Sequence, residues 1–355
     1  MRSQRADEIL ERISHEVFNN HEVDMLHLAF SPSVSQERLN SVLEGWDLNE
    51  EDIKCRTIAF NLAKTHPEIS FPEKYLKTLQ DIKLSCRERY LMILSHFLKI
   101  IKVLDSKGID YLLLKGGAMR VYRPDFSRWT ADIDILVPEG RYKEAQETIE
   151  SIGYIPFKSI HSTGFKDPAT KQAFVDIHRF VGIGTVKAKI LNEDLVRRSI
   201  SLPFSSLTVR VPSPEDMVFI SLVNFWKNVM ERTSDNSVSN MCFDLKFLKE
   251  YNEALNWEII RSEAIATDTV EAVYIAKKIL SEVLPDFFPT KFIEGDIDPS
   301  KLDKLISRMC YTRDSVRVLR QFNLSEAFKN IGSLSKYFLY RCKFFVVKRF
   351  HLILP

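Results

Sequence analysis

The chain has 355 residues, of which 45% are hydrophobic, so it can bury a substantial core, and its length suggests two domains or one domain with large additions. Its formal net charge of +2 provides no global basic field, which disfavours a long nucleic acid as its partner. Five scattered cysteines without a Cys-x-x-Cys pair argue against a zinc site or a disulfide framework, so we expect reduced thiols in a cytoplasmic protein.

The first 107 residues show only helical patterning, and we expect them to form an N-terminal helical region. Their start is charged and lacks the apolar core of a signal peptide, and no run in the chain is long enough to span a membrane. The clearest helix covers residues 85–107, where apolar residues recur every three or four positions and Gly108 is well placed to end the helix.

Residues 108–212 carry the motifs that indicate chemistry. The apolar run 111–114 is short enough for a buried strand, and Gly116 and Gly117 allow a sharp turn and a close approach to a ligand. Residues 130–137 alternate, so we expect Asp132 and Asp134 on one face of a strand and the neighbouring isoleucines on the other. Two neighbouring carboxylates repel each other, which is tolerable mainly when a cation lies between them.

A second alternating run, residues 173–178, places Asp176 and His178 on one face of another strand. Three strand-borne aspartates could therefore share one site. We interpret His178 as a structural histidine, because a histidine in such a position is more often satisfied by its neighbours than used as a ligand.

The three motifs occur in the sequence as Leu114-Lys-Gly-Gly117, Asp132-Ile-Asp-Ile-Leu-Val137 and Val175-Asp-Ile-His178. Together they resemble the DNA polymerase β-type nucleotidyltransferase superfamily, and more narrowly a bacterial family usually described only as uncharacterised nucleotidyltransferases. The resemblance covers roughly residues 109 to 180, with a slightly long spacer before Asp132. It departs at Gly117, where the superfamily usually has a serine, so backbone N–H groups and Lys115 remain as phosphate partners.

The resemblance implies an α/β (α+β) fold in which a small mixed sheet is flanked by N- and C-terminal helical regions. It implies transfer of a nucleoside monophosphate from ATP or another NTP to an unknown hydroxyl-bearing acceptor, with release of pyrophosphate by a two-metal mechanism. The acceptor could be a small molecule, a sugar, a protein or an RNA end. The implied catalytic residues and ligands of Mg²⁺ or Mn²⁺ are Asp132, Asp134 and Asp176. The implied NTP-binding residues are Lys115, Gly116 and Gly117.

Each motif also has an ordinary structural interpretation. A lone Asp-x-Asp can be a solvated strand face, and it occurs in metal-dependent glycosyltransferases as well. Asp176 could form an ion pair at a sheet edge, and Lys115 could extend into solvent, while Arg120 and Arg128 are expected as surface or helix-end charges. The rival function is a catalytically inactive nucleotide- or partner-binding protein that retains the fold. Gly117 supports this rival, and the three aspartates oppose it.

The remaining elements complete the predicted fold. After a helix at 141–152 we expect strands at 154–158, 162–166, 172–178 and 205–211. A C-terminal helical region, residues 213–335, should begin at the Ser213 cap and contain helices at 215–232, 238–251, 257–266, 269–284 and 298–310. Within it, Phe225 and Trp226 are expected in the core, and Asp244 in an ordinary ion pair.

Residues 336–355 form a tail with five lysines or arginines, many aromatic residues and no acid. Attachment to an anionic membrane or to an acidic partner is one interpretation of this composition. On a helical wheel, however, the basic residues scatter over three sides and do not form one polar face. We therefore prefer the interpretation that the tail docks on the protein's own helices, with its lysines reaching into solvent.

Overall fold

The computed structural model describes residues 2–18, 20–44, 46–51, 53–124, 130, 132–158, 162–179, 181, 192–205, 207–231, 237–252 and 254–321. Arg128 and the tail, residues 336–355, lie outside these ranges, so the expectations for them stay predictions. Among the described residues no helix is long and apolar enough to cross a membrane. The four described cysteines, at positions 55, 86, 242 and 310, are free thiols.

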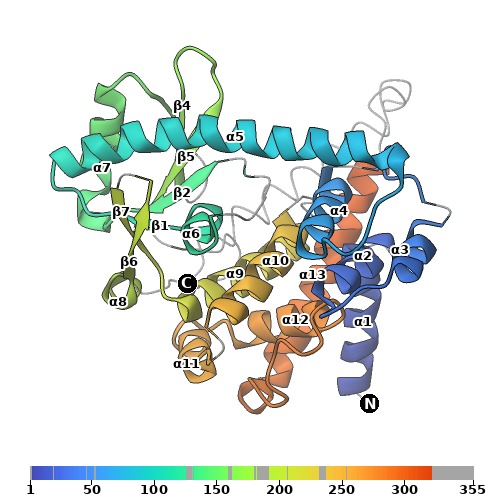
Figure 1. The fold of residues 1–355 in the computed structure, drawn as a ribbon. Coiled ribbons are helices and arrows are strands. Elements are labelled where there is room, and N and C mark those ends of the chain that lie inside the picture. Colours follow the sequence, from blue (N-terminus) through green and yellow to red (C-terminus); the bar gives the residue numbers. More distant parts are fainter. Residues whose placement is uncertain are drawn as a thin grey trace, which may run out of the picture.

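A five-stranded mixed sheet lies at one side of the molecule, with the strand order β1-β2-β5-β4-β3 (Figure 1). Strands β2 and β5 run parallel, whereas the other neighbouring strands run antiparallel. The predicted α/β fold with a small mixed sheet is therefore confirmed. The strands are β1 (Leu112–Leu113), β2 (Ile133–Leu136), β3 (Ile155–Lys158), β4 (Ser162–Lys166) and β5 (Ala173–His178).

The alternation read from the sequence holds along β2 and β5. Ile133 and Ile135 on β2, and Val175 and Ile177 on β5, are at most 2% exposed and belong to the hydrophobic core. Because successive side chains of a strand point to opposite faces, the acidic residues between them share the other face of the sheet. The sheet thus separates a packed apolar side from a side that carries carboxylates.

Helix α5 (Glu73–Ser106) is 34 residues long and runs across the whole molecule (Figure 1). It contacts α4 (Ile53–Thr65) in the helical half, and β5 and α7 (Tyr142–Ser151) in the half that holds the sheet. The helix begins well before the predicted residue 85, directly after Pro72. It ends as predicted, because Gly108 adopts a left-handed φ of 57° and its N–H donates to the carbonyl of Asp105.

The first and last helices of the chain form a second, helical half of the molecule (Figure 1). Helix α1 contacts α12 and α13, while α10, α11 and α12 all pack against the central helix α9. Their bounds are α1 (Arg2–Val17), α2 (Asn20–Phe30), α3 (Gln36–Leu43), α9 (Pro214–Glu231), α10 (Ser237–Tyr251), α11 (Trp257–Ala266), α12 (Val270–Leu280) and α13 (Pro299–Gln321). The division into four regions at residues 107, 212 and 335 stays a prediction.

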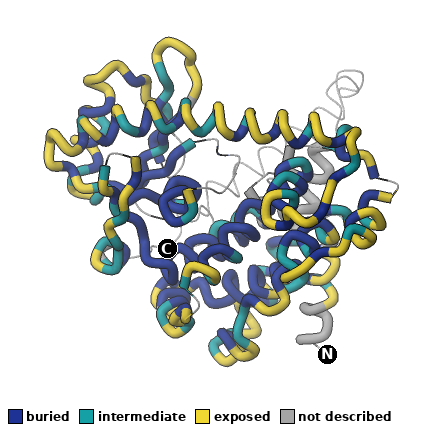
Figure 2. Tube along the Cα trace, in the orientation of Figure 1, coloured by how far each residue is buried: buried dark blue, intermediate teal, exposed yellow. Residues whose placement is uncertain are grey.

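Helix α9 starts and packs as its sequence indicates. The Ser213 hydroxyl accepts the backbone N–H of Asp216 at 3.2 Å, which caps the first turn. Phe225 and Trp226 are fully buried, so their assignment to the core is confirmed. Figure 2 shows that α9, α10 and α12 are largely buried, in contrast to the exposed outer face of α5.

A small second sheet was predicted only in part. Strand β7 (Leu207–Val211) matches the expected strand at 205–211, but it pairs with β6 (Ile200–Phe204), which was not expected. Helix α8 (Asn192–Arg198) was also not expected, and short 3-10 turns lie at Glu139–Arg141 and Glu294–Asp296. Strand β7 contacts β1, so this hairpin lies against the edge of the main sheet.

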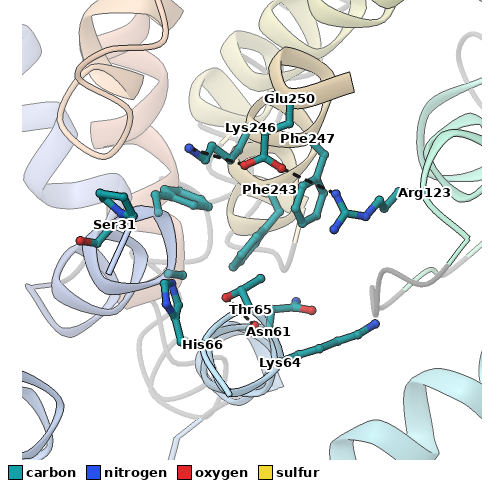
Figure 3. A pocket seen from close by; sticks show the side chains of 13 residues that line it. Ser31, Asn61, Lys64, Thr65, His66, Arg123, Phe243, Lys246, Phe247 and Glu250 are labelled. Atoms are coloured by element: carbon teal, nitrogen blue, oxygen red, sulfur yellow. Dashed lines mark hydrogen bonds and ion pairs between the residues drawn. The ribbon is translucent and has the colours of Figure 1, made fainter. Parts of the chain in front are cut away.

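A cavity of ≈ 560 Å³ opens in the helical half, between α2, α4 and α10 (Figure 3). Arg123, which directly follows α6 (Lys115–Tyr122), contributes to its lining from the side of the sheet. None of the aspartates predicted for the catalytic site lines this cavity.

Candidate active site

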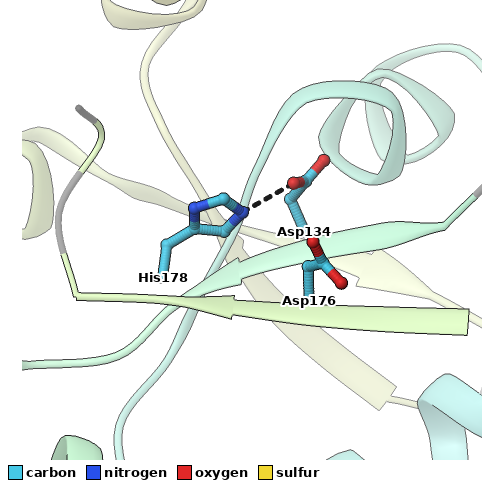
Figure 4. Close-up of side chains that lie close together, drawn as sticks. All are labelled: Asp134, Asp176 and His178. Atoms are coloured by element: carbon cyan, nitrogen blue, oxygen red, sulfur yellow. Dashed lines mark hydrogen bonds and ion pairs between the residues drawn. The ribbon is translucent and has the colours of Figure 1, made fainter. Parts of the chain in front are cut away.

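Strands β2 and β5 bring the predicted carboxylates together. Their parallel register pairs Asp134 with Asp176 and Leu136 with His178, so one face of the sheet carries all three polar side chains (Figure 4). Oxygen and nitrogen atoms of Asp134, Asp176 and His178 lie within 4.8 Å of one another. A parallel pair, in which both strands contribute acids at the same level, therefore forms the centre of the candidate site.

The carboxylate of Asp134 is the point on which the side chains converge. Its Oδ1 atom lies 2.7 Å from His178 Nε2 and 2.7 Å from Lys115 Nζ. The neighbouring carboxylate of Asp176 accepts a hydrogen bond of 3.3 Å from the Ser162 hydroxyl on β4. Asp134 is buried, which makes these charged and polar partners necessary.

Lys115 reaches Asp134 because α6 begins directly after β1. The N–H of Leu114 donates to the carbonyl of Asp134 at 2.9 Å, which fixes the start of α6 beside β2. Lys115 itself adopts a left-handed φ of 45°, an uncommon conformation for a residue with a side chain. The first helical hydrogen bond runs from the Ala118 N–H to the Leu114 carbonyl. The N–H groups before Ala118 precede that bond, as at any helix start.

Gly117 has a packing reason that the sequence did not reveal. A Cβ atom at this position would lie 2.6 Å from Leu113 Cδ1 and 3.2 Å from Ile133 Cγ2. Both of these side chains are buried, so there is little room to accommodate it. The glycine lets α6 pack closely on β1 and β2. A serine at this position would not fit without a shift of these neighbours, which accounts for the absence of the hydroxyl.

A second glycine, Gly164 on β4, lies directly opposite Asp176. A Cβ atom there would come within 2.6 Å of Asp176 Oδ1 and would also collide with the ring of Phe157. The glycine therefore leaves space for the carboxylate. Sequence reasoning missed this residue, because only the strand register shows that it faces Asp176.

Asp132 does not lie on the strand that was predicted to carry it. Strand β2 starts at Ile133, so Asp132 immediately precedes the strand, and it does not belong to the tight group formed by Asp134, Asp176 and His178. The prediction of one strand from 130 to 137 was therefore too long. Asp132 remains close enough to both other aspartates to interact with them electrostatically.

The three carboxyl groups have very different pKa values. Burial, together with repulsion from Asp134 and Asp176, raises the pKa of Asp132 to about 7. Burial would also raise the pKa of Asp134, but the Lys115 charge and the His178 hydrogen bond outweigh it and lower that pKa far below its ordinary value. For Asp176, burial and the nearby Asp134 charge raise the pKa. Negative charge is thus concentrated on Asp134.

The donor set fits a divalent cation. Two carboxylates and one imidazole converge, each with a ligand atom within 4.8 Å of the others. Carboxylate oxygens suit Mg²⁺ and Mn²⁺, and imidazole is a common ligand of transition metals. His178 is predicted to be a structural histidine satisfied by its neighbours, and its Nε2 atom does lie 2.7 Å from Asp134 Oδ1. Its position two residues after Asp176 also places it on the face that carries the carboxylates, within the group that could hold a metal.

Other predicted residues lie elsewhere. Arg120 was expected as a surface or helix-end charge, but it is only 8% exposed and its guanidinium lies 4.4 Å from the centre of the Tyr90 ring. Arg120 is a helix-end charge, since it lies in the last turn of α6, but it is not on the surface, because Tyr90 of α5 lies over its guanidinium. Asp244 is buried in α10 and takes no part in the carboxylate group.

A small mixed sheet with a lysine–glycine–glycine strand-to-helix junction and carboxylates on the adjacent strands defines a nucleotidyltransferase-type core. The model of one family, described as uncharacterised nucleotidyltransferase, matches residues 56–285. This match spans more than half of the chain, and the chain belongs to that family.

Two solved structures resemble about half of the chain at low identity. One is an antigenic nucleotidyltransferase-like protein from Paracoccidioides brasiliensis, with 13% identity and a TM-score of 0.33, covering 51% of this chain and 92% of its own. The other is the antibiotic-resistance factor ANT(2'')-Ia, with 14% identity and a TM-score of 0.33, covering 50% of this chain and 96% of its own. No curated protein matches the sequence with significant similarity.

Proposed function

We propose that the protein is a metal-dependent nucleotidyltransferase that transfers a nucleoside monophosphate from an NTP to a hydroxyl-bearing acceptor and releases pyrophosphate. The observation that carries this proposal is the convergence of Asp134, Asp176, His178 and Lys115 on one face of the β2–β5 pair. Repulsion between buried carboxylates destabilises the fold, so stability alone does not explain why they lie together.

Asp134 and Asp176 would hold Mg²⁺ or Mn²⁺, with His178 or Asp132 completing the protein ligands. A bound ion of this kind would polarise the α-phosphate and favour ionisation of the acceptor hydroxyl. Asp132 lies just before β2 and close to the other two aspartates, so its carboxylate would be available to a second ion beside the same group. This division retains the three predicted aspartates and adds His178.

The chain's own groups supply the remaining steps. Lys115 Nζ, at the start of α6, would neutralise charge on the triphosphate, and the first-turn N–H groups of Gly116 and Gly117 would orient it. Asp176 has a raised pKa and is only partly buried, so its carboxylate can accept the proton that the acceptor hydroxyl loses. The acceptor could be a small molecule, a sugar, a protein or an RNA end. The proposed location of the protein is the cytoplasm.

The rival function is binding without catalysis, for which the missing serine hydroxyl is the main argument. Close packing around Gly117 weakens that argument, because it supplies a structural reason for the glycine. Incubation with each α-labelled NTP and Mn²⁺ or Mg²⁺, with and without cell extract, distinguishes the two functions. Catalysis predicts metal-dependent pyrophosphate release and label on an acceptor, both lost in Asp134→Asn. Nucleotide binding without any release in every combination would favour the rival.

A further inference from the structure

The cavity in the helical half has features of a ligand site distinct from the carboxylate group. It lies where the end of α2, the end of α4 and the second half of α10 meet Arg123, and side chains from these elements line one space (Figure 3). Its volume of ≈ 560 Å³ falls within the usual range for small-molecule pockets. Arg123 follows the last residue of α6, whereas Lys115 is the first, so the cavity and the carboxylate group lie at opposite ends of this helix.

The charges around this cavity favour an anion. Three cationic side chains, Lys64, Arg123 and Lys246, line it together with a single carboxylate, Glu250. Glu250 is shared, because it lies 3.6 Å from Lys246 Nζ and 3.6 Å from an Arg123 nitrogen. Three positive charges and one negative charge leave a net charge of +2 at the cavity wall. Phosphate and carboxylate groups are the ordinary partners of such clusters.

Aromatic rings form the apolar part of the wall. Phe243 meets Phe30 edge-on with their ring centres 5.0 Å apart, and the Arg123 guanidinium lies 4.5 Å from the centre of the Phe247 ring. Rings arranged in this way offer faces and edges to a flat ligand. The combination of phenyl rings and cations suits a molecule with a planar body and an anionic group.

Asn61 supplies the observation that points to a specific ligand. This α4 residue lines the cavity and is 1% exposed, yet neither its amide oxygen nor its amide nitrogen has a hydrogen-bond partner. Buried polar groups are nearly always paired, and an unpaired one retains its full desolvation cost. The side-chain amide presents a donor and an acceptor side by side, which matches the edge of a nucleobase.

We propose that this cavity binds a nucleoside monophosphate, with the base edge paired to the Asn61 amide on α4 and the phosphate held by Lys246 on α10. The amide atoms of Asn61 are not exposed to solvent, so binding of the base includes a local shift of the side chains that cover them. This site does not depend on the transfer reaction, because it shares no residue with the carboxylate group.

The test is calorimetric titration of the full chain with AMP, GMP, CMP and UMP in EDTA, with inorganic phosphate and adenosine as partial ligands. We expect at least one monophosphate to bind the wild type, and to bind more tightly than either partial ligand. Asn61→Leu should weaken this binding about ten- to hundredfold. It should also melt at or above the wild-type temperature, because it removes an unpaired amide, and a merely structural asparagine would not show this combination.

Matched variants locate the binding and keep the test independent of Asn61. Lys246→Met should weaken binding of the same monophosphate. Lys143→Met is the control and should leave that binding unchanged, because Lys143 forms an equivalent i,i+4 pair with Glu147 on the exposed face of α7. Asp134→Asn, which alters the candidate active site, should bind as the wild type does. Absence of binding for all four monophosphates would overturn the proposal. So would binding that survives Asn61→Leu and Lys246→Met, or binding that only Asp134→Asn abolishes.

Discussion

Asp134 is the residue whose surroundings determine the character of the candidate site. It is buried, and a single oxygen of its carboxylate lies 2.7 Å from both Lys115 and His178. These partners keep it ionised, whereas burial and repulsion raise the pKa of Asp132 and Asp176. Negative charge is therefore available at one fixed position for a metal, and two further carboxyl groups respond to whatever binds beside it.

Asp134→Asn is expected to abolish nucleotidyl transfer while leaving the fold intact. The amide is close in size to the carboxylate, but it removes the charge that would hold the metal, which contributes several kcal/mol to the transition state. Because each ~1.4 kcal/mol is tenfold in rate, the loss should be on the order of a hundredfold or more. Pyrophosphate release measures the effect and circular dichroism confirms the fold. A loss smaller than about tenfold would contradict the metal-ligand role.

Asp132 should make the stability of the metal-free protein depend on pH. Its native pKa of about 7 lies above its unfolded value, so the native state binds more protons between the two values. Stability should therefore fall as the pH rises from about 4 to 7. Asp132→Asn removes this dependence and should be ~1–2 kcal/mol more stable than the wild type at pH 8, after allowance for solvent screening.

Urea unfolding in EDTA at pH 5 and pH 8 measures this difference. Asp81→Asn, which changes an exposed aspartate on α5, serves as the control and should retain the wild-type dependence. If the free energy of unfolding changes equally between pH 5 and pH 8 in Asp132→Asn and in the wild type, Asp132 is not repelled by the other carboxylates.

At the scale of elements, local patterns predicted the parts of the site that lie on regular strands. Period-two alternation correctly placed Asp134, Asp176 and His178 on one face. It failed for Asp132, since alternation does not reveal where strand pairing ends. Strand β6 escaped notice because it contains Pro203 and pairs only with β7. Asn61 and Gly164 could not be found from sequence, because their importance comes from neighbours that lie far away in the chain.

Gly117→Ser should test how closely α6 packs on the sheet. The added side chain would displace the buried Leu113, so we expect a loss of about 1–3 kcal/mol in the free energy of unfolding. Gly140→Ser is the control, because no atom lies within 4 Å of a Cβ atom at Gly140. Adding Leu113→Ala to Gly117→Ser should recover at least ~0.5 kcal/mol relative to the sum of the single changes. Strict additivity would mean that Leu113 is not the obstacle.

At the scale of the whole molecule, metal and nucleotide should stabilise the native state together. A ligand present at about 100 times its dissociation constant contributes roughly 2.7 kcal/mol, so Mn²⁺ with an NTP should raise the melting temperature measurably. The increase should be lost in an Asp132→Asn/Asp134→Asn double variant. An equal increase in both proteins would place the metal–nucleotide site away from β2.

Helix α5 makes a further prediction about the molecule as a unit, because it contacts α4 in one half and β5 in the other. Arg87→Pro, at an exposed position along this helix, should cost about 3 kcal/mol or more, since proline removes a hydrogen bond and collides with the preceding turn. Arg87→Ala should cost almost nothing. Chemical denaturation followed by circular dichroism measures both, and equal stability of the two variants would show that α5 is not continuous there.

The same continuity determines how heat should unfold the protein. If α5 unfolds in one half, the other half loses the contacts that it makes with the same helix. The two halves are therefore coupled through one continuous helix. A scanning calorimeter should therefore record one cooperative transition for the wild type, with matching calorimetric and van't Hoff enthalpies. In Arg87→Pro the coupling is interrupted, and the single peak should broaden or divide into two, one for each half.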